Sequence, residues 1–169
     1  MMNIKPGTIL ISAPLLEDPY FDKAVIYLAE INPYGALGFV INNLYPRGLN
    51  ELVEFKQSKA FPLYEGGPVK TESIYFIHHR PDLIEAGSCI TEPVYLGGNI
   101  QQAVQHINDG SISEKEIKLF LGYCGWDYGE LEDEVAEGSW LVLNSKDLNV
   151  FDLPITTLWE ECYEWWKKG

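Results

Sequence analysis

The order of strand-like and helix-like segments is the feature that most constrains the fold of this chain. Strand-like runs come in groups along the sequence, and helical patterns fall between some of them rather than after each one. A doubly wound parallel sheet requires steady alternation of strands and helices, so this order argues against it. It predicts an α+β fold with a largely antiparallel or mixed sheet, open or curled into a barrel, and with peripheral helices.

Turn residues and apolar periodicity predict the individual elements. Asn32-Pro33-Tyr34-Gly35 has the composition of a tight turn, so segments 24–31 and 37–42 are expected to form a hairpin. Asn99 is expected to cap a helix that Gly110 closes. The other predicted strands are 8–12, 73–78, 93–96, 116–123 and 139–143, and the other predicted helices are 49–55, 127–137 and 157–168.

Length and cysteine usage indicate one intracellular domain. A chain of 169 residues is most simply a single domain over residues 1–169. Three cysteines without a C-x-x-C spacing indicate a reducing cytosol rather than a disulfide scaffold, which predicts a cytoplasmic location. No apolar run approaches the roughly 18 residues of a membrane span, so no membrane association is expected.

The acidic composition argues against direct nucleic-acid binding. Twelve Lys and Arg stand against 25 Asp and Glu, a net charge of −13. Proteins bind duplex DNA mainly by neutralising its phosphates, and here the basic residues are scattered without forming a stripe. We therefore expect no specific duplex binding by this chain alone.

The segment 122–132 concentrates glycines, aromatics and acids. Because it follows the apolar run 117–121, it is expected to form the end of a strand, a glycine-rich turn and the start of an acidic helix. Asp127 and Glu130 have capping-box spacing. These acids would meet the positive end of the helix dipole and repel a phosphate, and the glycine spacing matches no phosphate-binding motif.

The titratable residues offer few candidates for catalysis. No His and Cys cluster has metal-ligand spacing, so neither a metal nor a cofactor is predicted. His78, at the end of a predicted strand, is the best histidine candidate. Glu132 could point into a cleft under Trp126, although a solvated acidic helix face is the more common situation. Cys124 is either a reactive thiol or, more commonly, a small buried apolar residue.

The C-terminal segment predicts an amphipathic helix with a wide aromatic face. Thr157 and Glu160 have capping-box spacing. We expect Leu158, Trp159 and Cys162 to dock on the sheet, while at least one of Trp165 and Trp166 stays partly exposed. Such a tryptophan would be a candidate interface with a protein partner or a second copy.

Four motifs together form a specific combination that covers nearly the whole chain. The first motif comprises residues 10–14 and 18–21, and the second comprises residues 35–42. The third comprises residues 66–69 followed by His78, and the fourth comprises residues 122–126 and 129–134 with Trp140. The combination resembles the AlgH family of bacterial proteins, whose members are sometimes labelled transcriptional regulators. The chain departs from it at Cys124, where the family commonly has a small residue, and at Glu130, where it commonly has Gln. The resemblance implies an α+β fold with a mixed sheet, and it implies no established activity.

The resemblance and the residues together predict one candidate cleft. We expect the two glycine motifs to meet in space around a shallow pocket that includes Asn42. The leading hypothesis is a regulatory protein that binds a protein or a small ligand rather than DNA. The alternative is a small-molecule enzyme that uses Asn42, His78 and Glu132. The candidate cleft residues are Asn42, Gly66, Gly67, Pro68, His78, Gly122, Tyr123, Gly125, Trp126 and Glu132.

Overall fold

A computed structural model describes residues 3–16, 18–144 and 148–169. The strands are β1 (Ile9–Ser12), β2 (Val25–Asn32), β3 (Gly35–Val40), β4 (Leu44–Gly48), β5 (Pro62–Glu65), β6 (Val69–His78), β7 (Ser88–Thr91), β8 (Val94–Leu96), β9 (Ile117–Asp127) and β10 (Trp140–Leu143). The helices are α1 (Ile100–Asn108), α2 (Glu130–Ala136) and α3 (Leu158–Lys168), with 3-10 turns η1 (Leu49–Glu51), η2 (Val53–Phe55) and η3 (Ile155–Thr157).

The strands form one mixed sheet that is mostly antiparallel. Its order is β10-β1-β2-β3-β9-β6-β8-β7, with β5 beside β9 and β4 beside β5. The β5–β9 pair is parallel and the other pairs are antiparallel. The two ends of the path, β10 and β7, do not pair with each other, so the sheet is open. The predicted α+β class is confirmed. The sheet does not close into a barrel, which was the alternative within that class.

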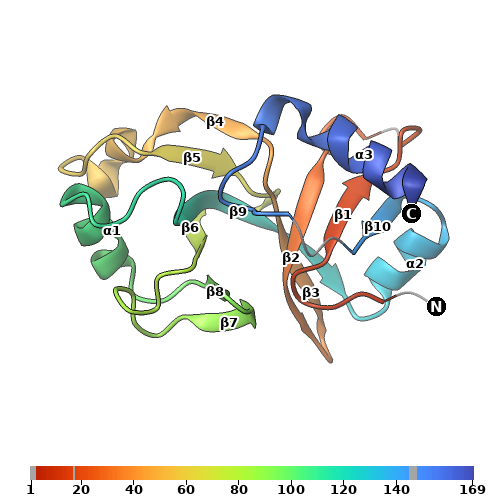
Figure 1. Cartoon of the computed structure of the whole chain (residues 1–169), viewed down its shortest axis with the longest axis horizontal. Coiled ribbons are helices and arrows are strands. Elements are labelled where there is room, and N and C mark those ends of the chain that lie inside the picture. Colours follow the sequence, from red (N-terminus) through yellow and green to blue (C-terminus); the bar gives the residue numbers. More distant parts are fainter. Residues whose placement is uncertain (1–2, 17, 145–147) are drawn as a thin grey trace.

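Strand β9 joins two halves of the molecule, which we call lobes (Figure 1). One lobe contains β4 to β8 and α1, and the other contains β1 to β3, β10, α2 and α3. The first part of β9 pairs with β5 and β6, whereas its residues 124–127 pair with β3. Gly122 lies at the register shift in the β6 pairing, between Leu121 and Tyr123 and just before residues 124–127, with φ +74°, a conformation that glycine adopts without strain. The glycine therefore allows one strand to change partners.

The hairpin, the Asn99 cap and most predicted elements are confirmed. The β2–β3 pair follows the predicted hairpin, and the Asn99 side chain accepts a hydrogen bond from Gln102 N–H at 3.0 Å. The sequence reading missed β4, β5 and β7, and segment 49–55 forms two 3-10 turns rather than a helix. These three strands have only four or five residues, too few for apolar alternation to show clearly.

The prediction for the glycine-rich segment was wrong. Strand β9 continues through Gly122 and Gly125 to Asp127, and only Tyr128 and Gly129 form the turn before α2. Tertiary pairing accounts for the difference, because residues 124–127 form a ladder with β3. The cap also differs, since the residue before α2 is Gly129 at φ +84° rather than Asp127. Glu130 does reach back, and accepts a hydrogen bond from Asp127 N–H at 2.6 Å.

The C-terminal helix packs as its sequence predicts. Leu158, Trp159 and Cys162 are 1%, 8% and 0% exposed, while Trp165 and Trp166 are 43% and 39% exposed. The predicted capping box is absent, because the Thr157 hydroxyl donates to the Glu161 carboxylate at 2.8 Å instead of accepting from the backbone. None of the helices in the described ranges has both the length and the apolar character needed to cross a membrane.

Candidate functional site

The two glycine motifs meet in the structure, as predicted. A Cβ on Gly67 would overlap the carbonyl group of Tyr123, and a Cβ on Gly122 would overlap the carbonyl oxygen of Gly67. Gly66 N–H donates to Leu121 O at 2.8 Å, and its own carbonyl accepts from Val40 N–H at 2.8 Å. Glycine is thus required here for backbone to approach backbone. The shallow pocket with Asn42 and a ligand-binding role at this junction stay predictions.

Asn42 lies close to the start of β2 and organises its backbone. Its Oδ1 accepts a hydrogen bond from Val25 N–H at 3.0 Å, and its Nδ2 donates to Lys23 O at 2.9 Å. Lys23 has φ +50°, an uncommon conformation for a residue with a side chain. The Asn42 amide therefore holds a strained turn in place.

His78 is completely buried at the end of β6. Its Nδ1 accepts a hydrogen bond from Arg80 N–H at 3.1 Å, so the ring proton is assigned to Nε2, which donates to Gly97 O at 2.9 Å. Burial lowers the pKa of His78 and favours the neutral ring. Both nitrogens are occupied by backbone partners, which leaves neither free to serve as a general base.

The carboxylate under Trp126 belongs to Glu134, not to Glu132. Glu132 is exposed on α2. The Glu134 Oε1 accepts hydrogen bonds from the indole N–H of Trp126 at 3.1 Å and of Trp140 at 2.8 Å. Glu134 lies three residues after the buried Leu131 and therefore on the same face of α2, whereas Glu132 lies on the exposed side.

The remaining residues of the predicted cleft have individual environments. Tyr123 packs edge-on against Tyr75 at 5.3 Å between ring centroids, and Pro68 is exposed. Cys124 is buried, its Sγ lies 3.4 Å from Gly66 O, and burial raises the pKa of its thiol to about 12. A thiol with that pKa is protonated at neutral pH and unreactive. His78 lies at the end of β6 in one lobe, whereas Asn42 follows β3 and Glu132 lies on α2 in the other (Figure 1), so the structure does not assemble the three into one group.

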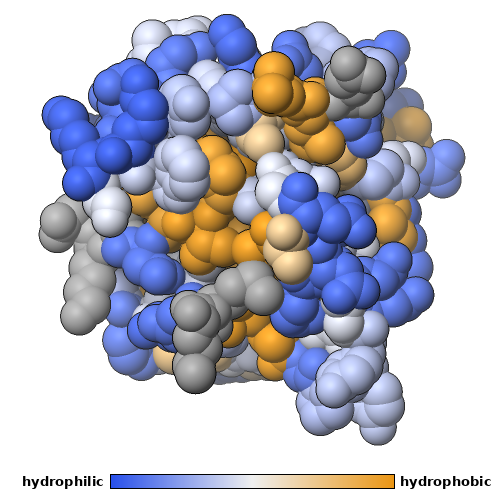
Figure 2. All heavy atoms as spheres, turned by 90° about the vertical axis from the view of Figure 1, so that its right-hand side faces the viewer, coloured by the Kyte–Doolittle hydropathy of each residue, from blue (hydrophilic) through white to orange (hydrophobic). Residues whose placement is uncertain are grey.

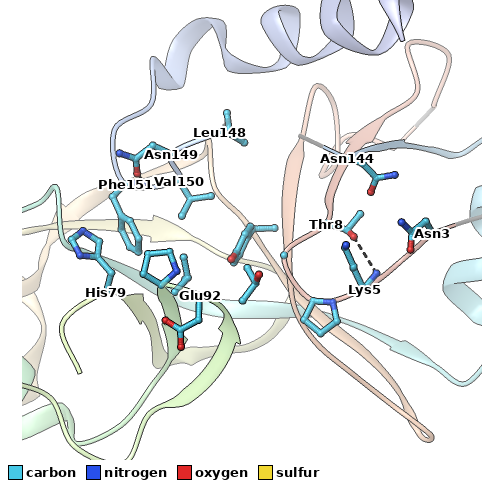
Figure 3. A pocket seen from close by; sticks show the side chains of 16 residues that line it. Asn3, Lys5, Thr8, His79, Glu92, Asn144, Leu148, Asn149, Val150 and Phe151 are labelled. Atoms are coloured by element: carbon cyan, nitrogen blue, oxygen red, sulfur yellow. Dashed lines mark hydrogen bonds between the residues drawn. The ribbon is translucent and has the colours of Figure 1, made fainter. Parts of the chain in front are cut away.

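A cavity of about 830 Å³ lies elsewhere, with walls from both lobes (Figure 3). We call it the inter-lobe cavity. Its volume falls within the range of small-molecule sites. Its lining residues are Asn3, Lys5, Pro6, Gly7, Thr8, Tyr27, His79, Thr91, Glu92, Pro93, Val94, Asn144, Leu148, Asn149, Val150 and Phe151.

Tyr27 lines this cavity, and its buried hydroxyl group is an unusual polar atom. The Tyr27 side chain is 3% exposed, and its hydroxyl has no hydrogen-bond partner among the described residues. Burial raises the pKa of Tyr27, so the phenol stays protonated and can both donate and accept. A buried hydroxyl without a partner costs about 1–3 kcal/mol. A bound molecule that supplied a partner would recover this free energy.

The rest of the cavity combines neutral polar groups with an apolar wall. Figure 3 places Asn3, Lys5, Thr8 and Asn144 on one side and His79, Glu92 and Phe151 on the other. The charged groups Lys5 and Glu92 are opposite in sign, and Glu92 already accepts a hydrogen bond from the Tyr95 hydroxyl at 3.0 Å. The lining therefore suits a molecule without net charge that has both apolar and hydrogen-bonding parts.

Sequence reasoning missed this cavity entirely. Its residues come from five separate stretches, and none of them forms a motif. The only local signal was the aromatic residue at position 27 of a predicted strand. Within residues 3–16, 18–144 and 148–169, no group of three or more His, Cys, Asp or Glu could hold a metal ion.

Solved structures of other proteins have a fold similar to that of this chain. The solution structure of the AlgH protein from Pseudomonas aeruginosa superimposes with a TM-score of 0.71 at 30% identity, covering 91% of this chain and 86% of that one. A crystal structure of a Corynebacterium diphtheriae protein gives a TM-score of 0.70 at 19% identity and covers 91% of each chain. The second likeness concerns the fold alone.

Proteins with similar sequences were also found. A UPF0301 protein of Bacteroides thetaiotaomicron is 32% identical over 165 residues, which cover 96% of this chain and 84% of that protein. A UPF0301 protein of Chlorobium luteolum is 35% identical over 157 residues, which cover 93% and 83%. The family model described as AlgH-like matches residues 9–167. The chain therefore belongs to the AlgH-like family.

Proposed function

We propose that this protein is a non-enzymatic binding protein that acts in regulation, and that its ligand is a small organic molecule in the inter-lobe cavity. The unpartnered hydroxyl of Tyr27 is the observation that carries the proposal, because it offers hydrogen-bonding capacity that the described residues leave unused. The opposite charges of Lys5 and Glu92 favour a ligand without net charge. The net charge of −13 supports regulation through a ligand or a protein rather than through DNA.

The enzymatic alternative has less support. Asn42 and His78 use their polar atoms in hydrogen bonds to backbone groups, and Glu132 is exposed on α2. A general base must be able to reach the proton that it removes. None of the three has a free, buried polar atom directed at a shared cavity.

A Tyr27→Phe variant tests the binding proposal. Thermal unfolding would be measured with a panel of nucleosides, neutral sugars and free amino acids with uncharged side chains, which carry no net charge near pH 7. We expect at least one compound to raise the Tm of the natural protein, because a ligand stabilises the folded state by RT ln(1 + [L]/Kd). In Tyr27→Phe the same compound should bind about 5- to 10-fold more weakly, since one hydrogen bond contributes about 1 kcal/mol.

The unliganded variants provide the control. Tyr27→Phe should be at least as stable as the natural protein, because it removes a buried polar atom that has no partner. Tyr34→Phe, at an 86% exposed position in the β2–β3 turn, should change neither stability nor binding. A clear loss of unliganded stability in Tyr27→Phe, or a panel without any binder, would contradict the proposal.

Self-association through α3 is a second candidate function. Apolar residues reach the surface on the face that includes the end of α3 (Figure 2). A groove of about 690 Å³ beside Trp166 is lined by Leu15, Leu16, Leu141 and Tyr163 among others. The exposed charges of α3 run from acidic (Glu160, Glu161, Glu164) to basic (Lys167, Lys168). Two copies packed antiparallel would place opposite charges together, which favours a second copy as the occupant.

Sedimentation at about 100 µM protein tests this candidate. We expect the natural chain to form dimers and a Trp165→Ser/Trp166→Ser double variant to dimerise at least 30-fold more weakly, because loss of an aromatic anchor costs about 2 kcal/mol or more. Tyr34→Ser is the control for loss of an exposed aromatic residue elsewhere. A natural chain that is monomeric at this concentration would exclude a second copy as the partner.

A further inference from the structure

A second cavity, of about 280 Å³, is lined in part by Lys118 on strand β9. We call it the Lys118 cavity. Its wall includes Tyr64, Glu114, Lys115, Phe151 and Asp152. Lysine is almost never fully buried unless it is paired, yet Lys118 is 6% exposed. The site is distinct from the inter-lobe cavity, although Phe151 contributes to both.

The contacts of Lys118 leave its amine under-coordinated. Nζ lies at 3.5 Å from Val150 O, a long hydrogen bond, and at 4.2 Å from the centroid of the Tyr64 ring. No carboxylate among the described residues forms an ion pair with it. An ammonium group has three N–H donors and its burial is costly unless it is paired. The geometry therefore disfavours the charged form of this side chain.

Burial accordingly lowers the pKa of Lys118 to about 8. At pH 7.4 roughly a fifth of such amines are uncharged, against about 0.1% for a lysine with an ordinary pKa. An uncharged amine is a nucleophile, and desolvation in an apolar pocket is a known means of activating lysine towards carbonyl compounds.

The charges at the cavity wall decide which reactant is favoured. The wall carries both signs, with Glu114 and Asp152 against Lys115, so it favours neither an anion nor a cation over a neutral molecule. The volume of the cavity admits only a small molecule. A small uncharged electrophile is thus the best match to this lining.

We infer that Lys118 is a reactive amine that captures small aldehydes as an imine. The nitrogen lone pair attacks the carbonyl carbon, and the carbonyl oxygen takes up a proton to give a carbinolamine. That proton comes from the nitrogen, so the carbinolamine keeps one N–H. Loss of this last nitrogen-bound proton together with the hydroxyl group, as water, then forms the C=N bond. The overall reaction converts one amine and one aldehyde into one imine and one water, without any oxidant or reductant. Water that enters the cavity exchanges protons with the adduct.

Reductive labelling tests this inference. The folded protein would be treated with glycolaldehyde and sodium cyanoborohydride at pH 7.4, digested, and analysed by mass spectrometry for the rate of modification at each lysine. We expect Lys118 to be modified at least 10-fold faster than Lys115, which lines the same cavity and is exposed. In denaturant the two rates should become similar, because the difference depends on the folded environment.

Two variants complete the experiment. Lys118→Arg retains a positive charge but has no reactive amine, and should remove the fast-labelling site. Lys115→Arg should leave the rate at Lys118 unchanged. Modification of Lys118 at or below the rate of Lys115 in the folded natural protein would overturn the inference, and would identify Lys118 as a structural cation held by Tyr64. That comparison needs no variant, so a folding defect in Lys118→Arg could not obscure the result.

Discussion

A Gly67→Ala variant is expected to lose about 3–5 kcal/mol of folding stability or to fail to fold. The added Cβ would overlap the carbonyl carbon and oxygen of Tyr123 and the amide nitrogen of Cys124. These are backbone atoms of β9, the strand that joins the two lobes, so they cannot move aside without disrupting the pairing with β3. Urea denaturation followed by tryptophan fluorescence would measure the loss.

Gly125→Ala is the matched control in the same strand. A Cβ at Gly125 would meet only the ring of Tyr123, at 3.3 Å, and the residue does not have a positive φ. Since a ring can shift slightly, we expect a change below about 1 kcal/mol. Equal stabilities of the two variants would show that the glycine junction tolerates side chains, against the close backbone approach described above.

A Glu134→Ala variant is expected to destabilise the protein by about 2–4 kcal/mol, because it leaves two indole N–H donors without an acceptor. Trp126 and Trp140 are 8% and 3% exposed, so water has little access to replace the lost carboxylate. Denaturant unfolding gives the free energy difference.

Two further substitutions separate hydrogen bonding from charge and helix propensity. Glu134→Gln retains a carbonyl acceptor and should lose less stability than Glu134→Ala. Glu132→Ala, on the exposed side of the same helix, should stay within about 0.5 kcal/mol of the natural protein. If Glu132→Ala were as destabilising as Glu134→Ala, the bridge between the two tryptophans would not be the source of the effect.

Local signals in the sequence determined much of the secondary structure. Asn32-Pro33-Tyr34-Gly35 specified the hairpin turn, and Asn99 specified the start of α1, because each acts through hydrogen bonds and dihedral preferences within a few residues. The division of α3 into buried Leu158, Trp159 and Cys162 and exposed Trp165 and Trp166 followed from helical periodicity and the width of its aromatic face. The motif combination was also sufficient to identify the family.

Only the tertiary structure decided what the glycine-rich segment does. Its residues have the composition of a turn, but the ladder with β3 draws them into β9, and this non-local pairing outweighs local preference. The packing of α2 likewise decided that Glu134, and not Glu132, accepts from the two indoles. The inter-lobe cavity likewise depends on residues that are distant in sequence, such as Tyr27 and Phe151. Whether a buried hydroxyl or amine finds a partner depends on how distant segments pack, and no periodicity or spacing in a single sequence encodes that.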